Sequence, residues 1–194
     1  MARKTTKALL ACAIAWAFAA PAEAVTILYT AALGPEAPGA TGTGSTTLTL
    51  DTDVNTLRVE AVWSGLSAGT TVAHLHCCTA APGTGLAGVA TTVPTFPGFP
   101  TGVTSGNYDM TFDLLAGATW NPAFIAANGG TAAGAAAALI AGLNAGTAYL
   151  NIHSSSFPGG EIRGFPVIPE PATAALVLLG LAALGAARGR ARTG

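Results

Sequence analysis

The segment STTLTLDTDVNTLRVEAVWSGL, residues 45–66, contains two runs in which apolar and polar side chains alternate. In the first run, 46–51, leucines alternate with threonines, and in the second, 57–63, apolar residues alternate with an arginine and a glutamate. A period of two is typical of a strand that buries one face. The turn-forming residues 53–55 separate the runs, so the segment predicts an antiparallel hairpin.

The same alternation recurs on both sides of this hairpin and predicts further strands at 25–32, 72–77, 108–114, 147–153 and 161–165. Glycine- and proline-rich stretches at 34–44 and 82–106 predict loops. The alanine-rich segment 131–143 has helical spacing and predicts the single helix. The sequence therefore predicts an all-β fold, an antiparallel β-sandwich of about seven or eight strands with one short helical insertion.

The N-terminal segment, residues 1–24, has the three parts of a secretory signal peptide. Three basic residues precede an apolar run at 8–20, and the small-x-small pattern at 21–24 predicts cleavage by signal peptidase after Ala24. An apolar run of 13 residues is short for a membrane span, which argues against an uncleaved anchor.

The C-terminal region combines a polar tripeptide, an apolar run and a basic tail. Pro169, Glu170 and Pro171 precede an uncharged run at 172–187, and the tail occupies 188–194. A helix of these 16 residues is about 24 Å long, close to the thickness of a bilayer core, and predicts a transmembrane helix. The basic cluster that stops transfer and keeps the domain outside the cytoplasm consists of Arg188, Arg190 and Arg192.

This arrangement, residues 167–194, resembles the PEP-CTERM sorting signal of Gram-negative bacteria that make exopolysaccharide. The resemblance implies export across the inner membrane, transient anchoring by the C-terminal helix, and cleavage by an exosortase-type enzyme. The protein is therefore expected at the cell surface or in the extracellular matrix. Exopolysaccharide and other surface proteins are its candidate partners there.

The region between the two ends is acidic. Residues 25–168 carry seven acidic and two basic side chains, so their net charge is −5. Two bases cannot neutralise a phosphate backbone, which excludes nucleic acid as a partner class. A low charge with many threonines, glycines and alanines suits an extracellular all-β domain.

Three segments together resemble the CHRD domain, a module named after chordin that also occurs in exported bacterial proteins. They are the hairpin at 45–66, VAHLHCCTAAPGTG at 72–85 and LNAGTAYLNIHSSSFPGGEIRGF at 143–165. The resemblance covers residues 25–166 and implies an immunoglobulin-like β-sandwich without a settled activity. This chain departs from the family at Cys77-Cys78, where members commonly have glycine after the second histidine.

All three histidines of the chain lie on polar faces of predicted strands. His74 and His76 share one face of their strand, because side chains alternate along a strand. In the closing hairpin, the apolar pair Ile152 and Ile162 sets the register. The polar pairs that follow are His153 with Glu161 and Asn151 with Arg163.

Two interpretations of these residues stay open. In the first, His74, His76 and His153 bind zinc or copper, and Glu161 is a fourth ligand or a hydrogen-bonding partner of one. In the second, the histidines hydrogen-bond the neighbouring strands and orient the hairpin. Two histidines at alternate positions do not decide between a cofactor site and an architectural one.

Cys77 and Cys78 are the cysteines of the mature region, because Cys12 lies within the signal segment. Adjacent cysteines reach disulfide geometry only in a strained turn. The options are a vicinal disulfide, a crosslink to another chain, or a thiol pair that adds to the histidine site.

The sequence contains no nucleophile elbow and no phosphate loop, which favours a protein that is not an enzyme. The main hypothesis is an exported surface or matrix module with a binding or structural role associated with exopolysaccharide. The alternative is a zinc- or copper-binding protein with a redox-related role.

Overall fold

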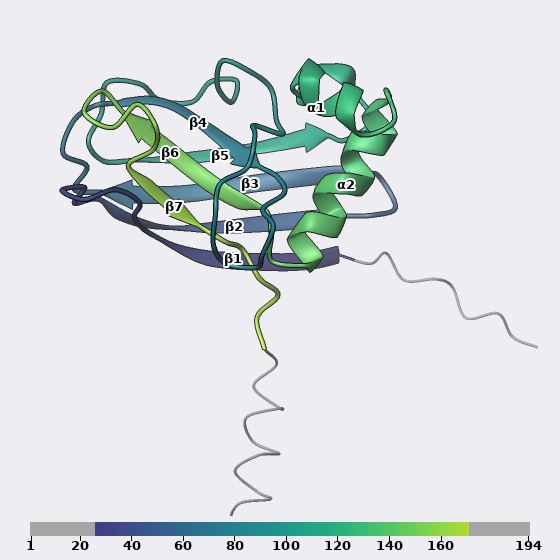
Figure 1. The fold of residues 1–194 in the computed structure, drawn as a ribbon, viewed down its shortest axis with the longest axis horizontal. Helices are drawn as coiled ribbons and strands as arrows, with labels where there is room; N and C mark the ends of the chain where they lie inside the picture. The colour runs from purple at the N-terminus through teal and green to yellow at the C-terminus, as the bar shows by residue number, and fades with distance from the viewer. Residues whose placement is uncertain (1–25, 171–194) are drawn as a thin grey trace, which may run out of the picture.

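The computed structural model describes residues 26–170, which form an all-β fold with two small α-helices (Figure 1). This confirms the expected fold class. The strands are β1 (Thr26–Pro35), β2 (Thr43–Asp51), β3 (Thr56–Ser64), β4 (Thr70–His76), β5 (Gly106–Asp113), β6 (Tyr149–Ser154) and β7 (Ile162–Gly164). The expected signal peptide, the apolar segment 172–187 and the arginine cluster lie outside the described residues.

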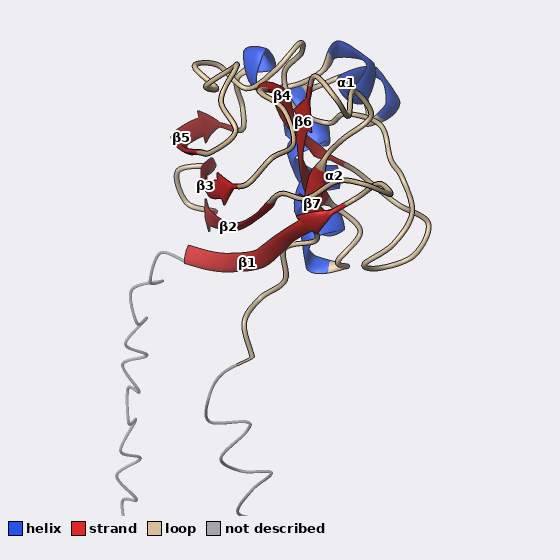
Figure 2. Cartoon of the chain, turned by 90° about the vertical axis from the view of Figure 1, so that its left-hand side faces the viewer, coloured by secondary structure: helices blue, strands red, loops and turns tan. Residues whose placement is uncertain are grey.

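Hydrogen bonds join the strands into one antiparallel sheet in the order β4-β6-β7-β1-β2-β3-β5. The long strand β1 connects its two halves, because residues 26–33 pair with β2 while Gly34 and Pro35 pair with β7. The sheet curls, so that β4 and β6 lie across the core from β2, β3 and β5 (Figure 2). The immunoglobulin-like sandwich stays a prediction, because the seven strands of residues 26–170 belong to a single sheet.

The predicted hairpin at 45–66 is present as β2 and β3. Its register pairs Leu48 with Val59 and Leu50 with Leu57, and all four side chains are buried. The alternating polar residues lie on the outer face of the sheet, where Arg58 forms an exposed ion pair with a neighbouring strand. The period of two therefore determined both the strands and the face that they bury.

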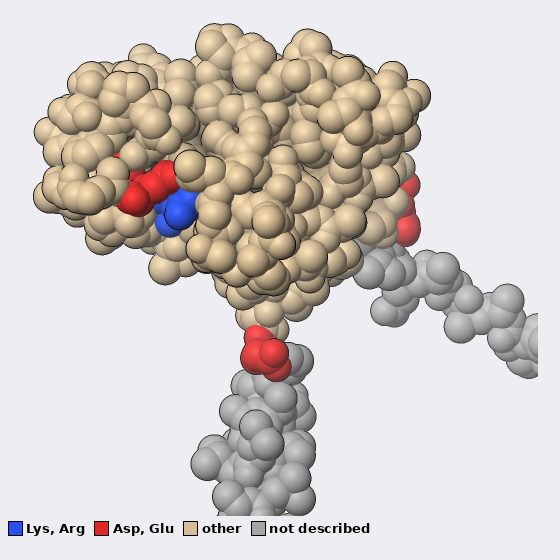
Figure 3. Space-filling model, in the orientation of Figure 1, with Lys and Arg blue, Asp and Glu red and all other residues tan. Residues whose placement is uncertain are grey.

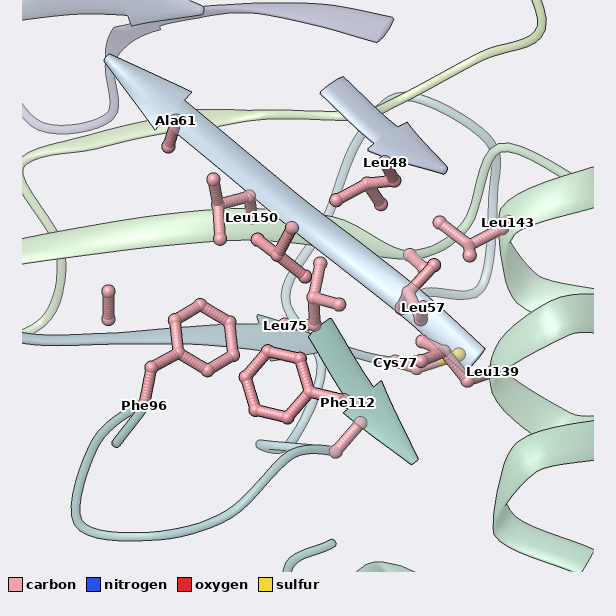
Figure 4. Packing of buried hydrophobic residues seen from close by; sticks show 14 of the residues in the cluster. Leu48, Leu57, Ala61, Leu75, Cys77, Phe96, Phe112, Leu139, Leu143 and Leu150 are labelled. Carbon is pink, nitrogen blue, oxygen red and sulfur yellow. The ribbon is translucent and has the colours of Figure 1, made fainter. Parts of the chain in front are cut away.

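The core lies between the two halves of the curled sheet (Figure 4). Leu75 of β4 and Leu150 of β6 point toward Leu48 and Phe112 from the opposite half, and all of these side chains are buried. The helix α2 (Ala132–Asn144) covers one end of this core with its buried leucines. The opposite, polar face of β4 and β6 thus stays available for the histidines.

The helical region differs from the expectation of one helix. The expected helix is present as α2, where Thr131 accepts a hydrogen bond from the Gly134 N–H at 3.0 Å. A second helix, α1 (Pro122–Ala127), precedes it and follows a single 3-10 turn. Asn121 caps α1 and proline occupies its first position, which are both ordinary start signals of a helix.

The chain leaves the fold immediately before the sorting tripeptide. Val167 exchanges two backbone hydrogen bonds with Thr30 of β1, at 2.8 and 3.0 Å. Pro169 follows only two residues later. No helix within residues 26–170 is long and apolar enough to cross a membrane, and the expected spanning segment 172–187 lies outside this range.

Candidate metal centre

The structure brings the three histidines together on the polar face of β4 and β6. His74 and His76 project from β4, where His74 pairs with Asn151 of the neighbouring strand. His153 projects from the same face of β6, two residues beyond Asn151. One ring nitrogen of each histidine lies within 4.8 Å of the corresponding nitrogens of the other two. The side chains are 5 to 8 % exposed, so the cluster is buried.

One ring N–H of each histidine donates a hydrogen bond to a backbone carbonyl of a loop. The bonds are His74 Nε2 to Pro94 O at 2.6 Å, His76 Nδ1 to Ala87 O at 2.9 Å and His153 Nδ1 to Pro158 O at 2.8 Å. A carbonyl only accepts, so these bonds fix the tautomer of each ring. The remaining lone pairs, on His74 Nδ1, His76 Nε2 and His153 Nε2, are buried without a hydrogen-bond partner.

Burial favours the neutral form of two of the three histidines. Desolvation is the main reason why the pKa of His74 is lowered to about 4; the nearby His153 and His76 also lower it, and the bond to Pro94 opposes them. Desolvation also lowers the pKa of His76, which likewise lies close to His153. Neutral imidazole is the form that binds metals. His74 and His76 are therefore in their metal-binding state at neutral pH.

Ring stacking holds the orientation of the cluster. His76 lies flat on Tyr149 of β6, with ring centroids 4.8 Å apart and planes 7° from parallel. His74 and His153 meet edge to face at 5.6 Å. With one nitrogen of each ring already bonded to the backbone, little freedom remains for the second nitrogen. This orienting of ligand rings by their surroundings is typical of metal-binding histidines.

Glu161 does not join the cluster. The predicted register is confirmed, because Ile152 pairs with Ile162 and Asn151 pairs with Arg163. However, β7 begins at Ile162, and the Glu161 carboxylate accepts the Ser67 N–H at 2.6 Å. The strand alternation that directs a side chain to the polar face therefore does not reach Glu161.

The acidic group beside the histidines is Glu36, which the sequence did not single out. Its carboxylate forms an ion pair of 3.2 Å with Arg163 and is 9 % exposed. Burial raises the pKa of Glu36, while the nearby Arg163 guanidinium opposes the rise. Glu36 follows the end of β1 within a stretch that reads as a loop, so only the pairing of β1 with β7 places it here.

The comparisons with known proteins agree with this architecture. The model of the CHRD domain matches residues 26–165, more than half of the chain. The chain belongs to the CHRD domain family. The PEP-CTERM protein-sorting motif matches residues 167–192, so this CHRD protein is exported and sorted by an exosortase system. Both resemblances seen in the sequence are thus confirmed, and neither a curated protein nor a solved structure matches the chain.

The adjacent cysteines of this CHRD domain face away from the histidines. Cys77 and Cys78 are joined by a disulfide, and both sulfurs lie 3.8 Å from the Ala138 carbonyl oxygen of α2. A Cβ built on Gly142 of α2 would overlap both sulfur atoms. The disulfide therefore packs between β4 and α2, and supplies no thiolate to the histidine cluster.

The histidines give the metal-free CHRD domain a defined pH dependence. The pKa of His74 is about 4 in the folded protein and about 6.5 when unfolded, so the unfolded state binds more protons between these values. We expect the free energy of unfolding to be constant above pH 6.5 and to fall by roughly 3 kcal/mol as pH drops to 4. Denaturant titration of the parent and a His74→Gln variant checks this. An equal fall in both proteins would contradict it.

Proposed function

We propose that this exported CHRD protein binds one transition metal ion, zinc or copper, through His74 Nδ1, His76 Nε2 and His153 Nε2. Two observations carry the proposal: the three histidines bring one ring nitrogen each within 4.8 Å of one another, and each ring keeps one buried nitrogen without a hydrogen-bond partner. Imidazole nitrogens are preferred ligands of both metals. The loop carbonyls supply the supporting hydrogen bonds that such ligands normally have.

A purely architectural role explains only half of the geometry. One hydrogen bond per ring suffices to attach the loops to the strands, and it leaves the second nitrogen of each ring buried and unpaired. Each unpaired buried acceptor costs about 1–3 kcal/mol. A tetrahedral zinc ion requires nitrogens roughly 3.4 Å apart, so small ring movements bring the cluster to bonding geometry. Binding would thereby remove all three penalties.

The destination of the protein determines the compartment in which this site would bind its metal. We infer that residues 172–187 anchor the protein transiently in the membrane, until an exosortase-type enzyme processes it near Pro169. The bridge between Val167 and Thr30 supports this, because the sheet still holds Val167 and Pro169 follows it by only two residues. The metal would then be bound at the cell surface or outside the cell.

Elemental analysis of the full chain tests the proposal. The protein is isolated from its host without chelator and without an affinity tag that contains histidine. We expect about one zinc or copper per chain, and loss of this metal in the His74→Ala/His76→Ala/His153→Ala variant. A folded parent without metal would overturn the proposal. The histidines would then be architectural, and a binding or structural role associated with exopolysaccharide would be the remaining candidate.

A further inference from the structure

More unpartnered acceptors lie on this face than three ring nitrogens. Asn151 Oδ1 and Glu36 Oε2 are also buried and without a hydrogen-bond partner. Asn151 is next to His74 across β4 and β6, and next to Arg163 across β6 and β7. Imine nitrogens, an amide oxygen and a carboxylate oxygen all accept hydrogen bonds, and none of them donates one. These five atoms therefore lack a cation or a hydrogen-bond donor.

Glu36 and Asn151 present their free oxygens at one place. A Cβ built on Gly160 would overlap Glu36 Oε2 and the side-chain amide of Asn151. The other carboxylate oxygen, Glu36 Oε1, is held by Arg163 at 3.2 Å. Asn151 pairs with His74 and precedes His153 by two residues in β6, so its side chain lies next to the histidine cluster. Arg163 thus orients the carboxylate and leaves one oxygen free.

Resting on the metal function above, we propose that the bound ion carries an exchangeable water molecule as its fourth ligand, positioned by Glu36 and Asn151. Three imidazoles leave one position of a tetrahedral ion open, and a water lone pair fills it. The two protons of this water reach Asn151 Oδ1 and Glu36 Oε2. One ion and one water molecule then supply every partner that the five acceptors lack.

A surface pocket lies beside Glu36, on the side from which we expect other ligands to reach this position. The pocket has a volume of about 490 Å³, and Glu36, Gly160 and Arg163 line it. Pro158, whose carbonyl accepts the His153 N–H, lies in the same wall. Figure 3 shows one place where acidic and basic atoms meet, whereas the other acidic atoms in this view, at the right-hand edge and the lower end, have no basic atoms beside them. Small oxygen- or nitrogen-donor molecules are thus the class of ligand that exchanges with the water.

The test uses the full chain loaded with cobalt(II), whose visible spectrum reports the ligands of the ion. We expect azide to shift the absorption bands, because it replaces the water. A Glu36→Gln variant should bind azide about tenfold more tightly, since a nearby carboxylate repels an anion. The matched control is Glu60→Gln on the outer face of β3, which should leave azide affinity unchanged.

The copper(II)-loaded parent gives a measurement that depends on no variant. An exchanging water ligand speeds the relaxation of bulk water protons, and azide should abolish this effect. If cobalt and copper bind but azide changes neither spectrum and the copper protein does not speed the relaxation of water protons, the proposed water ligand is wrong, whereas the metal function is not affected. Failure of both ions to bind would overturn the metal function as well. Equal azide affinity in Glu36→Gln and the parent would refute the role of Glu36.

Discussion

A His153→Ala variant is expected to bind zinc or copper at least about a hundredfold more weakly than the parent. His153 is the ligand from β6, whereas His74 and His76 both come from β4. Without the His153 ring, only the two histidine nitrogens from β4 remain as ligands. The ion then no longer links β4 to β6. Competition titration against a chromophoric chelator measures the change. The fold should persist, because the ring lies on the polar face and outside the hydrophobic core.

The control for this variant is Glu161→Gln. Glu161 is buried as His153 is, but its carboxylate binds the Ser67 N–H, and a glutamine oxygen can still accept that bond. We therefore expect metal affinity close to that of the parent. Equal losses of metal affinity in both variants would mean that general destabilisation of the fold weakens binding. Parent-like affinity in His153→Ala would remove this residue from the site.

A Gly160→Ala variant is expected to lower the free energy of unfolding by about 3 kcal/mol or more, and to weaken metal binding. Gly160 has a φ of +128°, which a side chain strains. Its added methyl group would also overlap the Glu36 carboxylate and the Asn151 amide. Both side chains would have to leave the histidine face. Denaturant titration and metal titration of the same preparation measure the two effects.

The neighbouring glycine provides a matched control. A Cβ built on Gly159 meets no atom within 4 Å, and this residue does not have a positive φ. Gly159→Ala should therefore change the free energy of unfolding by no more than about 0.5 kcal/mol. Similar losses of stability in both variants would show that the loop between β6 and β7 tolerates no side chain at either glycine. Parent-like stability of Gly160→Ala would contradict the close packing of Glu36 and Asn151.

Local alternation explains why much of the fold and of the histidine cluster was predictable. The pairs Leu48 with Val59 and Ile152 with Ile162 follow from a period of two and a short turn, which depend only on nearby residues. The same period directs His74, His76 and His153 to one face. Alternation alone could not show that β4 and β6 are neighbours, because that pairing joins distant segments.

The features of the site that the sequence did not predict depend on contacts between segments that are distant in the chain. Glu36 reaches the site because β1 extends to Pro35 and pairs with β7. The carbonyls of Ala87 and Pro94 come from the long connection between β4 and β5, whose path no sequence pattern specifies. The contact of the Glu161 carboxylate with the Ser67 N–H also joins distant segments, and no local pattern predicts it. By contrast, α1 had a readable signal in its Asn121-Pro122 start.

Anomalous diffraction from crystals of the host-purified protein, recorded at the zinc and copper absorption edges, tests the metal site most directly. We predict one peak at about 2.0–2.1 Å from each of His74 Nδ1, His76 Nε2 and His153 Nε2. The use of Nδ1 by His74 and Nε2 by the other two follows from their backbone hydrogen bonds. A metal-containing crystal without a peak at these three nitrogens would contradict the proposed site.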